Sequence, residues 1–409
     1  MAADDPLPVP GVRREALPDP EAVGEDAALV EAIRAEIRAR GPITFARFME
    51  RALYEPGHGY YRRPEPAPGL AGADFLTAPE AHPIAGAAIG RLLEQAWEAL
   101  GSPDRFLVVE AGAGTGALAA GLLGGLRDLG SPLLGAIRYR AVDVEVSRLE
   151  ALRARLARDG LAQLLAHDGD STAVGAVVAN EVLDALPVHR VVGRAGGIAE
   201  LLVSLDGDRF AWDEAAPTTP ALARRLAREG VALAEGQVTE VCLALDDWLS
   251  GATRWLERGV VVLLDYAAEP ADLHDATDHP RGTLRAFARH AVGADPFRHV
   301  GRQDLTATVD LQAVRDAAAA AGLDSVGETT QAELLARAGT PDLTGVYLGR
   351  PGVTIQDALA LRSALARLLD PRGLGGFRVL AYGRGLPARA SLDALARVTR
   401  ETRSPDGRG

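Results

Sequence analysis

Residues 106–116, FLVVEAGAGTG, decide the fold of this chain. The apolar run 106–109 predicts a short buried strand, and the glycine-rich loop after it opens a helix that extends to about residue 129. Glycines in such a loop tolerate positive φ angles and let the backbone approach a ligand closely. Because doubly wound sheets bind ligands at the carboxyl ends of their strands, we expect a binding site at this loop.

Strands and helices continue to alternate beyond the loop. We expect further strands at 137–144, 163–166, 174–179, 260–264 and 377–381, and helices at 148–158 and 310–321. This alternation predicts an α/β fold, a doubly wound, Rossmann-like parallel sheet with helices on both faces. An insertion at about 190–255 interrupts the alternation, and in it an antiparallel hairpin is expected to turn at Asp206-Gly207.

The chain ahead of the first strand divides into a tail, two helices and a long loop. Residues 1–26 are acidic and rich in proline, which predicts a flexible tail. A helix is expected to begin near Ala27 and to end at Gly41, and Thr44 is expected to cap a second helix. Residues 54–80 are rich in glycine and proline, and their aromatic side chains favour an ordered loop.

The composition excludes several kinds of active site. All 44 basic residues are arginine, so no lysine can form a Schiff base or bind the phosphates of ATP. The single cysteine, Cys242, excludes an internal disulfide, a multi-cysteine zinc site and an iron–sulfur cluster. The formal net charge of −12 disfavours DNA or RNA as a partner. No metal is expected, because His274 and His279 lie in a polar loop without a partner array of carboxylates and histidines.

The sequence predicts neither a targeting signal nor a membrane span. The N-terminal segment lacks the basic start and apolar core of a secretory signal, and no uncharged stretch reaches the roughly 20 apolar residues of a spanning helix. The absence of lysine, with abundant alanine, arginine and glycine, suggests a GC-rich bacterial genome. We therefore expect a cytoplasmic protein without a membrane partner.

Two cofactors compete for the glycine loop. Gly112-x-Gly114-x-x-Ala117 satisfies the dinucleotide pattern, in which the start of the helix binds a pyrophosphate. The longer string that runs from Glu110 through Gly112 and Gly114 to Gly116 resembles the S-adenosylmethionine (SAM) loop of class I methyltransferases. Glu110 favours SAM, because a carboxylate suits a cationic ligand and would repel a pyrophosphate. A purely structural glycine turn is the third alternative.

An acidic residue after the next strand is expected to accept hydrogen bonds from ribose hydroxyls. Asp143 and Glu145 are both candidates, and the pattern does not choose between them, because positions two apart on a strand point the same way. His167-Asp168 follows the expected third strand, where such enzymes often contact adenine. A solvated loop pair is the alternative for these two residues.

The fourth strand leads into residues 180–187, NEVLDALP. Asn180 and Glu181 follow an apolar strand directly, which places them at the ligand edge of the sheet beside the glycine loop. If the turn is helical, Glu181 and Asp184 share one face, and their carboxylates could bind a guanidinium through bidentate hydrogen bonds. The alternative is a helix N-terminus, where acidic residues are favoured by the helix dipole.

Taken together, these segments resemble the MidA-type SAM-dependent methyltransferases, a family that includes a protein-arginine methyltransferase. The resemblance runs from about residue 41 to residue 383. Its markers are GPITF at 41–45, LYEPGHGYY at 53–61, DFLTAPE at 74–80, EAGAGTG at 110–116, NEVLDALP at 180–187, LDY at 264–266, GTLR at 282–285, DLTATVD at 304–310 and TQ at 330–331. The chain departs from the family at Ala73, Ala78 and Thr308, where the usual residues are Gly, Ser and His.

The resemblance implies a class I methyltransferase sheet with an N-terminal lid and an inserted subdomain. The implied division is a tail at 1–26, N-terminal helices and lid loop at 27–103, a methyltransferase domain at 104–389 with its insertion, and a C-terminal tail at 390–409. The implied cofactor is SAM. The residues implied to hold it are Glu110, Gly112, Gly114, Gly116, Asp143, Glu145, His167, Asp168, Asn180 and, in the lid, Asp74, Phe75 and Thr77.

By the same resemblance, Glu181 and Asp184 face the methyl acceptor as catalytic residues. The implied function is methylation of an arginine side chain in a protein substrate, since carboxylates can localise the charge of a guanidinium and accept its proton. Two alternatives stay open. One is a small-molecule N- or O-methyltransferase, and the other is a SAM-binding assembly scaffold without catalysis.

Overall fold

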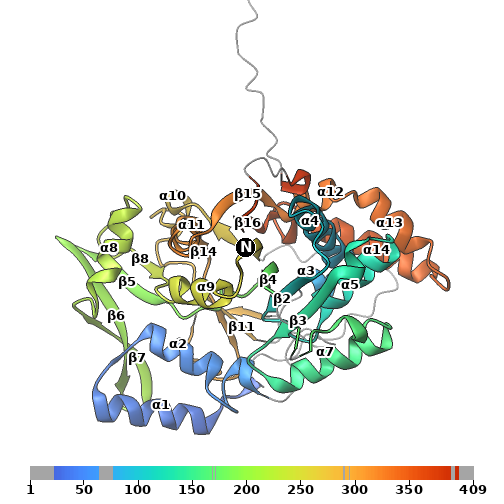
Figure 1. Ribbon diagram of the computed structural model, residues 1–409. Coiled ribbons are helices and arrows are strands. Elements are labelled where there is room, and N and C mark those ends of the chain that lie inside the picture. Colours follow the sequence, from blue (N-terminus) through green and yellow to red (C-terminus); the bar gives the residue numbers. More distant parts are fainter. Residues whose placement is uncertain are drawn as a thin grey trace, which may run out of the picture.

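The computed structural model describes residues 23–63, 77–167, 169–170, 172–288, 291–293, 295–387 and 392–395. A mixed six-stranded sheet in the order β15-β16-β9-β4-β2-β3 forms its centre (Figure 1). The strands are β2 (Phe106–Ala111), β3 (Ile137–Val142), β4 (Val174–Asn180), β9 (Arg258–Asp265), β15 (Asp324–Thr330) and β16 (Arg378–Arg384). The strands β3, β2, β4 and β9 run parallel, and β16 is antiparallel to both of its neighbours. The predicted fold class is confirmed.

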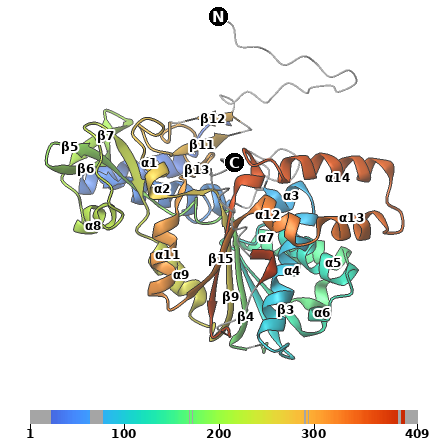
Figure 2. The same cartoon turned by 90° about the horizontal axis from the view of Figure 1, so that it is seen from above.

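Helices cover both faces of this sheet, as Figure 2 shows. On β4, Ala176 and Val178 belong to the core that also contains α4 (Ile84–Ala99), α5 (Ala117–Asp128) and α7 (Val146–Arg158). The alternate residues, Val177 and Ala179, pack in the core with α9 (Leu245–Thr253) and α11 (Leu311–Ala320). Since successive side chains of a strand point to opposite faces, an apolar run without polar interruption is what a strand buried on both faces requires.

The prediction of a third strand at residues 163–166 is wrong. Residues Ala162–Leu164 form a 3-10 turn, η3, and Leu165 makes only a single bridge, to Tyr139 of β3. The segment still lies along the edge of the sheet, beside β3. One bridge does not extend a ladder, so the sheet ends at β3 among the described residues.

The insertion forms a second sheet together with the N-terminal helices. Its strands are β5 (His189–Arg194), β6 (Gly197–Asp206), β7 (Arg209–Ala215) and β8 (Val238–Val241), and the short β1 (Ile43–Thr44) pairs with β6. The hairpin of β6 and β7 is confirmed, and pairing of Asp206 with Arg209 places its two-residue turn at Gly207-Asp208, one position later than expected.

The N-terminal helices pack on this second sheet rather than on the central one (Figure 2). Both begin as predicted: α1 (Ala27–Arg40) is capped by Asp26, whose carboxylate accepts from the amide of Leu29, and α2 (Phe45–Tyr54) is capped by Thr44. A cluster of aromatic rings, Phe45, Phe48, Phe210, Trp212 and Phe297, forms the contact. The helices and the insertion therefore form one body beside the carboxyl edge of the central sheet.

The remaining helices, strands and 3-10 turns complete the described fold. They are α3 (Ala78–Ala81), α6 (Leu133–Ala136), α8 (Pro220–Arg228), α10 (Pro270–Leu273), α12 (Gln331–Arg337), α13 (Thr340–Leu348), α14 (Ile355–Leu368), β10 (Ala267–Ala268), β11 (Arg285–Ala288), β12 (Ala291–Gly293), β13 (Asp304–Thr306), β14 (Val309–Asp310) and the 3-10 turns η2 (Tyr60–Arg62), η4 (Leu374–Gly376) and η5 (Asp393–Leu395). Within the described part of the chain, no helix has the length and apolar character needed to cross a membrane.

Candidate active site

The glycine loop joins β2 to α5, and each of its glycines has a positive φ: +69° at Gly112, +51° at Gly114 and +81° at Gly116. A Cβ at Gly112 would meet the side chain of Val182 at 2.6 Å, and one at Gly116 would meet Leu152 at 2.6 Å. A Cβ at Gly114 would meet nothing within 4 Å. Gly112 and Gly116 are therefore required by packing within the protein, whereas Gly114 borders open space, as a residue beside a bound ligand would.

Glu110, the first residue of the glycine motif, is directed into the protein. Its side chain is buried, and its Oε2 accepts a hydrogen bond from the hydroxyl of Tyr139 on β3 at 2.8 Å. Burial raises the pKa of Glu110 to about 8, with the charge of Asp143 acting in the same direction and the Tyr139 hydrogen bond opposing it. The carboxyl is thus held neutral around pH 7, which a nearby cation would reverse.

The two candidate ribose acids occupy different environments. The side chain of Asp143 is 4% exposed. Both of its carboxylate oxygens accept hydrogen bonds from backbone amides, Oδ2 from Gly114 at 2.9 Å and Oδ1 from Glu145 at 3.0 Å. Glu145 caps α7 through one oxygen only, Oε1, which accepts from the amide and the hydroxyl of Ser147. Asp143 is committed to the shape of the loop, and Glu145 keeps one oxygen for a ligand.

The other expected cofactor contacts are only partly described. His167 is exposed in a loop where its backbone amide donates to Asp170. Thr77 is the N-cap of α3, and its amide donates to Glu80 at 3.4 Å. Asp74, Phe75 and Asp168 lie outside the described residues.

The segment after β4 does not form the helical turn that was one of the expectations. Glu181 has φ +54°, a left-handed conformation that is uncommon outside glycine, and its amide donates to the carbonyl of Leu264 on β9 at 2.8 Å. The chain therefore continues the sheet pairing for one residue and then turns sharply. The prediction of a shared helical face for Glu181 and Asp184, and the alternative of a helix N-terminus, are both wrong.

The turn nevertheless brings Glu181 and Asp184 together, with a third carboxyl group, Asp265, at the end of β9. Asp265 is buried, and its Oδ2 accepts hydrogen bonds from the amides of Leu183 at 3.0 Å and Asp184 at 3.3 Å. Glu181 Oε1 accepts from the side-chain amide of Asn180 at 3.0 Å and from the backbone amide of Ala78 at 3.4 Å. The latter bond connects the described end of the lid segment to the carboxyl cluster.

The pKa values of all three carboxyl groups are raised. Burial, and next the negative charge of Asp184, raise the pKa of Glu181 to about 8. Burial raises the pKa of Asp184 to about 6, although the nearby Tyr266 hydroxyl opposes this. The pKa of Asp265 lies well above its usual range because of burial and the other two carboxyl groups. No ion pair joins any of the three to a described arginine or histidine, so the cluster would be stabilised by a cationic ligand.

Tyrosines from the N-terminal region close one side of this cluster. The Tyr54 hydroxyl donates to the carbonyl of Ala185 at 3.0 Å, and the Tyr61 hydroxyl donates to both oxygens of the buried Asp304 at 2.8 Å. The two rings are stacked, with centroids 5.6 Å apart, and the guanidinium of Arg148 lies 5.5 Å from the Tyr61 centroid. An aromatic wall beside buried carboxylates suits a guanidinium, which can stack on rings while its N–H groups are paired.

Sequence reasoning assigned no role to Asp265, Asp304, Tyr54 or Tyr61. They come from segments far from Glu181 in sequence, and only the fold brings them to the same edge. Their occurrence in the motifs LDY, DLTATVD and LYEPGHGYY was the available signal. His274, in contrast, lies outside this site, and the expectation that it lacks a partner array is wrong for the carboxylates, because Glu229 and Asp310 flank it.

Known proteins share both the sequence and the fold. Residues 88–329 match the family described as putative S-adenosyl-L-methionine-dependent methyltransferase. The protein arginine methyltransferase NDUFAF7 homolog, mitochondrial, of Drosophila melanogaster is 30% identical over 90% of this chain and 87% of its own length. Its Rattus norvegicus counterpart is 29% identical over 83% and 80%. A crystal structure from Burkholderia thailandensis with S-adenosyl-homocysteine bound is 35% identical, covers 96% of this chain and 98% of its own, and superposes with a TM-score of 0.79.

Proposed function

This chain belongs to the family of putative S-adenosyl-L-methionine-dependent methyltransferases, and we propose that its methyl acceptor is the guanidinium of an arginine side chain in a protein. The observation that carries the proposal is the cluster of Glu181, Asp184 and Asp265, three carboxyl groups with raised pKa values and no described cation beside them. The relatives named as protein arginine methyltransferases support the same acceptor.

The residues of the glycine loop fit SAM as the cofactor. Gly114 leaves open space at the end of β2, and Glu145 has a free carboxylate oxygen at the end of the neighbouring strand, where ribose hydroxyls could donate to it. We assign the ribose contact to Glu145 and the shaping of the loop to Asp143. When bound, SAM supplies an electrophilic methyl group on a sulfonium centre.

The chain itself positions the acceptor. Glu181 and Asp184 would each accept charge-assisted hydrogen bonds from a guanidinium, whose positive charge lowers their raised pKa values and ionises them. Oδ2 of Asp265 is not available to a guanidinium, because it accepts hydrogen bonds from the backbone amides of Leu183 and Asp184. These bonds fix the position of Asp184. The wall of Tyr54 and Tyr61 limits access of water to the cluster.

A proton must also leave the guanidinium when a methyl group is added to one of its nitrogens. A bound guanidinium ionises Glu181, and burial beside other carboxyl groups, which raises the pKa of Glu181 to about 8 without a ligand, gives the resulting carboxylate a high proton affinity. Glu181 is also in the strained conformation noted above, and strained residues cluster at functional sites. We propose Glu181 as the proton acceptor and Asp184 as its partner in holding the guanidinium.

A labelling experiment tests the acceptor directly. The purified chain is incubated with isotope-labelled SAM and a soluble lysate, and the labelled species are digested and identified by mass spectrometry. We expect label on arginine residues of a protein. Label confined to small molecules would favour the small-molecule methyltransferase, and tight SAM binding without transfer to any species would favour the scaffold. The cytoplasmic location stays a prediction, which cell fractionation would test.

A further inference from the structure

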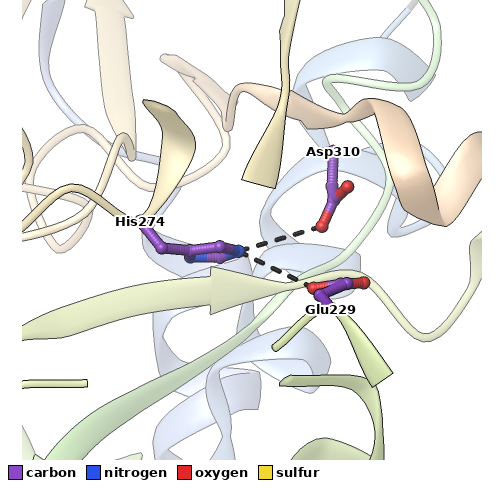
Figure 3. A group of neighbouring side chains, drawn as sticks. All are labelled: Glu229, His274 and Asp310. Carbon is purple, nitrogen blue, oxygen red and sulfur yellow. Dashed lines mark ion pairs between the residues drawn. The ribbon is translucent and has the colours of Figure 1, made fainter. Parts of the chain in front are cut away.

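Three ionisable side chains from separate segments meet at a second place, beneath the insertion (Figure 3). Glu229 follows α8, His274 follows α10, and Asp310 is the N-cap of α11. The Nε2 of His274 lies 3.8 Å from Oε2 of Glu229 and 3.8 Å from Oδ2 of Asp310. The facing atoms of all three residues lie within 4.8 Å of one another.

The protein leaves these facing atoms without hydrogen bonds. The side chain of Glu229 is 1% exposed and that of His274 is 4% exposed. Neither oxygen of Glu229 nor Nε2 of His274 has a hydrogen-bond partner. Outside the cluster, Glu229 has one ion pair, between its Oε1 and Nη1 of Arg225 at 3.8 Å, whereas its Oε2 faces Nε2 of His274. Buried polar atoms nearly always have hydrogen-bond partners, so a carboxylate and an imidazole nitrogen that face each other without one indicate a missing partner. All three residues line a cavity of about 30 Å³, which is enough for one ion and a water molecule.

We propose that Glu229, His274 and Asp310 form a binding site for one divalent transition-metal ion such as Zn²⁺. One imidazole nitrogen and two carboxylate oxygens supply three protein ligands, and water from the cavity completes the coordination. Zinc bonds of about 2.0–2.1 Å place two ligand atoms of a tetrahedral site about 3.3 Å apart. The two separations of 3.8 Å from Nε2 of His274 exceed this value by about 0.5 Å, and the facing atoms of Glu229 and Asp310 lie within 4.8 Å of each other, so the ligands would close on the ion by small side-chain movements.

Neighbouring groups already orient two of the ligands. The Nδ1 of His274 shares a hydrogen bond of 2.8 Å with the hydroxyl of Thr239, which leaves Nε2 directed at the cavity. Asp310 uses Oδ1 to cap α11, accepting from the amides of Gln312 and Ala313, and leaves Oδ2 directed at His274. Such outer hydrogen bonds fix the tautomer and the direction of metal ligands.

The donor set selects the class of metal. An imidazole nitrogen with two carboxylates suits Zn²⁺ and similar first-row ions, whereas Ca²⁺ and Mg²⁺ prefer oxygen ligands alone. The charges are compatible, because two carboxylates suit a divalent ion, and Arg225, which lies 3.8 Å from Oε1 of Glu229, also pairs with Asp316 at 3.1 Å. The competing occupant is a proton on His274, which would turn the three residues into a salt-bridged cluster.

The position of the site indicates a structural role. Glu229 belongs to the insertion, while Asp310 caps a helix that packs on the central sheet. The cavity is also lined by Leu183, whose amide is bound by Asp265 in the carboxyl cluster. A metal ion here would hold the insertion against the sheet directly behind the turn that carries Asp184. This role does not depend on the identity of the methyl acceptor.

The test is a zinc titration of the full chain after treatment with a chelator. Bound zinc is measured by elemental mass spectrometry and the melting temperature by calorimetry. We expect about one zinc ion per chain and a melting temperature that rises with zinc concentration, because the metal binds the folded state. The variants are Glu229→Gln, His274→Gln and Asp310→Asn, of which the last keeps the Oδ1 that caps α11.

Thr239→Ala removes the hydrogen-bond partner of His274 and should weaken zinc binding roughly 10- to 100-fold, as loss of such an outer partner does. Each of the three ligand variants should weaken zinc binding by more than this. His279→Gln, which removes a histidine outside the cluster, is the matched control and should bind zinc normally. Circular dichroism in the absence of zinc establishes that each variant folds. A wild-type chain that binds no zinc, or folded Glu229→Gln and Asp310→Asn variants that bind it as tightly as the wild type, would overturn the proposal.

Discussion

The backbone amide of Gly114 donates a hydrogen bond to Oδ2 of Asp143, with 2.9 Å between the two atoms. This bond crosses from the loop after β2 to the loop after β3, so the two neighbouring strands hold the glycine loop in place together. Arg148 adds an ion pair to the same carboxylate at 3.6 Å. Of the two acids after β3, Asp143 is thus part of the scaffold, and Glu145 alone has an oxygen to offer.

The first prediction separates the roles of these two acids. Glu145→Gln keeps the oxygen that caps α7 and should lower the affinity for S-adenosyl-homocysteine roughly 10- to 150-fold, the range for losing a charged hydrogen bond of ~1.5–3 kcal/mol. Its melting temperature without ligand should not change. Asp143→Asn should lower that melting temperature, because the backbone amide of either Gly114 or Glu145 would then face the NH₂ group of the asparagine side chain and lose its hydrogen bond. Calorimetry measures both quantities, and the opposite assignment would exchange the two phenotypes.

The second prediction concerns the space beside Gly114. Gly114→Val should abolish binding of S-adenosyl-homocysteine, because the branched side chain would occupy the open space at the end of β2. Gly130→Val is a matched control, since Gly130 also has a positive φ, +65°, and nothing within 4 Å of its Cβ position, but lies in the turn after α5. Both variants carry the same backbone strain of roughly 1–2 kcal/mol. Equal ligand affinity in the two variants would show that Gly114 does not border the cofactor.

Local patterns in the sequence were sufficient for much of the fold. Continuous apolar runs identify β2, β4 and β9 because these strands are buried on both faces, and the capping residues Asp26 and Thr44 mark the starts of α1 and α2. The prediction of a strand at 163–166 was wrong. This segment lies at the edge of the sheet, where a strand has a neighbour on one side only, and apolar character alone does not show that a ladder of hydrogen bonds forms. Local signals are reliable where the environment is uniform along the segment.

Features that depend on distant partners could not be predicted in the same way. The pattern of Glu181 and Asp184 suggested a helical turn, but the bond from the Glu181 amide to Leu264 extends the sheet instead. Asp265 joins the carboxyl cluster only because β9 lies next to β4. The same holds for Glu229, His274 and Asp310, which no local pattern connects. The sequence therefore identified the residues that follow β4, and the fold was needed to supply their neighbours.

The third prediction concerns pH and Glu110. Its pKa is about 8 in the folded chain against an ordinary value of 4.5, so the folded state binds this proton more tightly than the unfolded state. The free energy of unfolding should therefore decrease as pH rises from about 4.5 to 8, by up to about 4–5 kcal/mol for this group. Glu110→Gln cannot ionise, keeps an acceptor for Tyr139 and should lack this part of the decrease. Denaturant unfolding at several pH values without ligand measures the difference, and parallel curves for the two proteins would contradict the raised pKa.

The last prediction concerns the acceptor side, where three carboxyl groups have three different attachments. Asp265 holds the backbone of the turn, Asp184 depends on that turn for its position, and Glu181 is held by Asn180 and the amide of Ala78. If Glu181 and Asp184 bind a guanidinium through charge-assisted hydrogen bonds, Glu181→Gln should reduce the methylation rate of the identified acceptor by roughly 10- to 150-fold. S-adenosyl-homocysteine affinity should stay within a fewfold of the wild type.

Asp184→Asn should reduce the methylation rate in the same way. Asp265→Asn should reduce both the methylation rate and the melting temperature, because it would weaken the hydrogen bonds that hold the turn at Leu183 and Asp184. A pH–rate profile adds a readout that a merely structural role for Glu181 would not change. With Glu181 as the proton acceptor, the rate of the wild type should rise with pH as this carboxyl ionises, and Glu181→Gln should remove that rise. Loss of cofactor binding in Glu181→Gln would instead place the residue in the cofactor site. An unchanged rate in Glu181→Gln would exclude it from the acceptor site, because Glu181 is one of the two carboxyl groups proposed to bind the guanidinium, and its amide cannot replace a charge-assisted hydrogen bond.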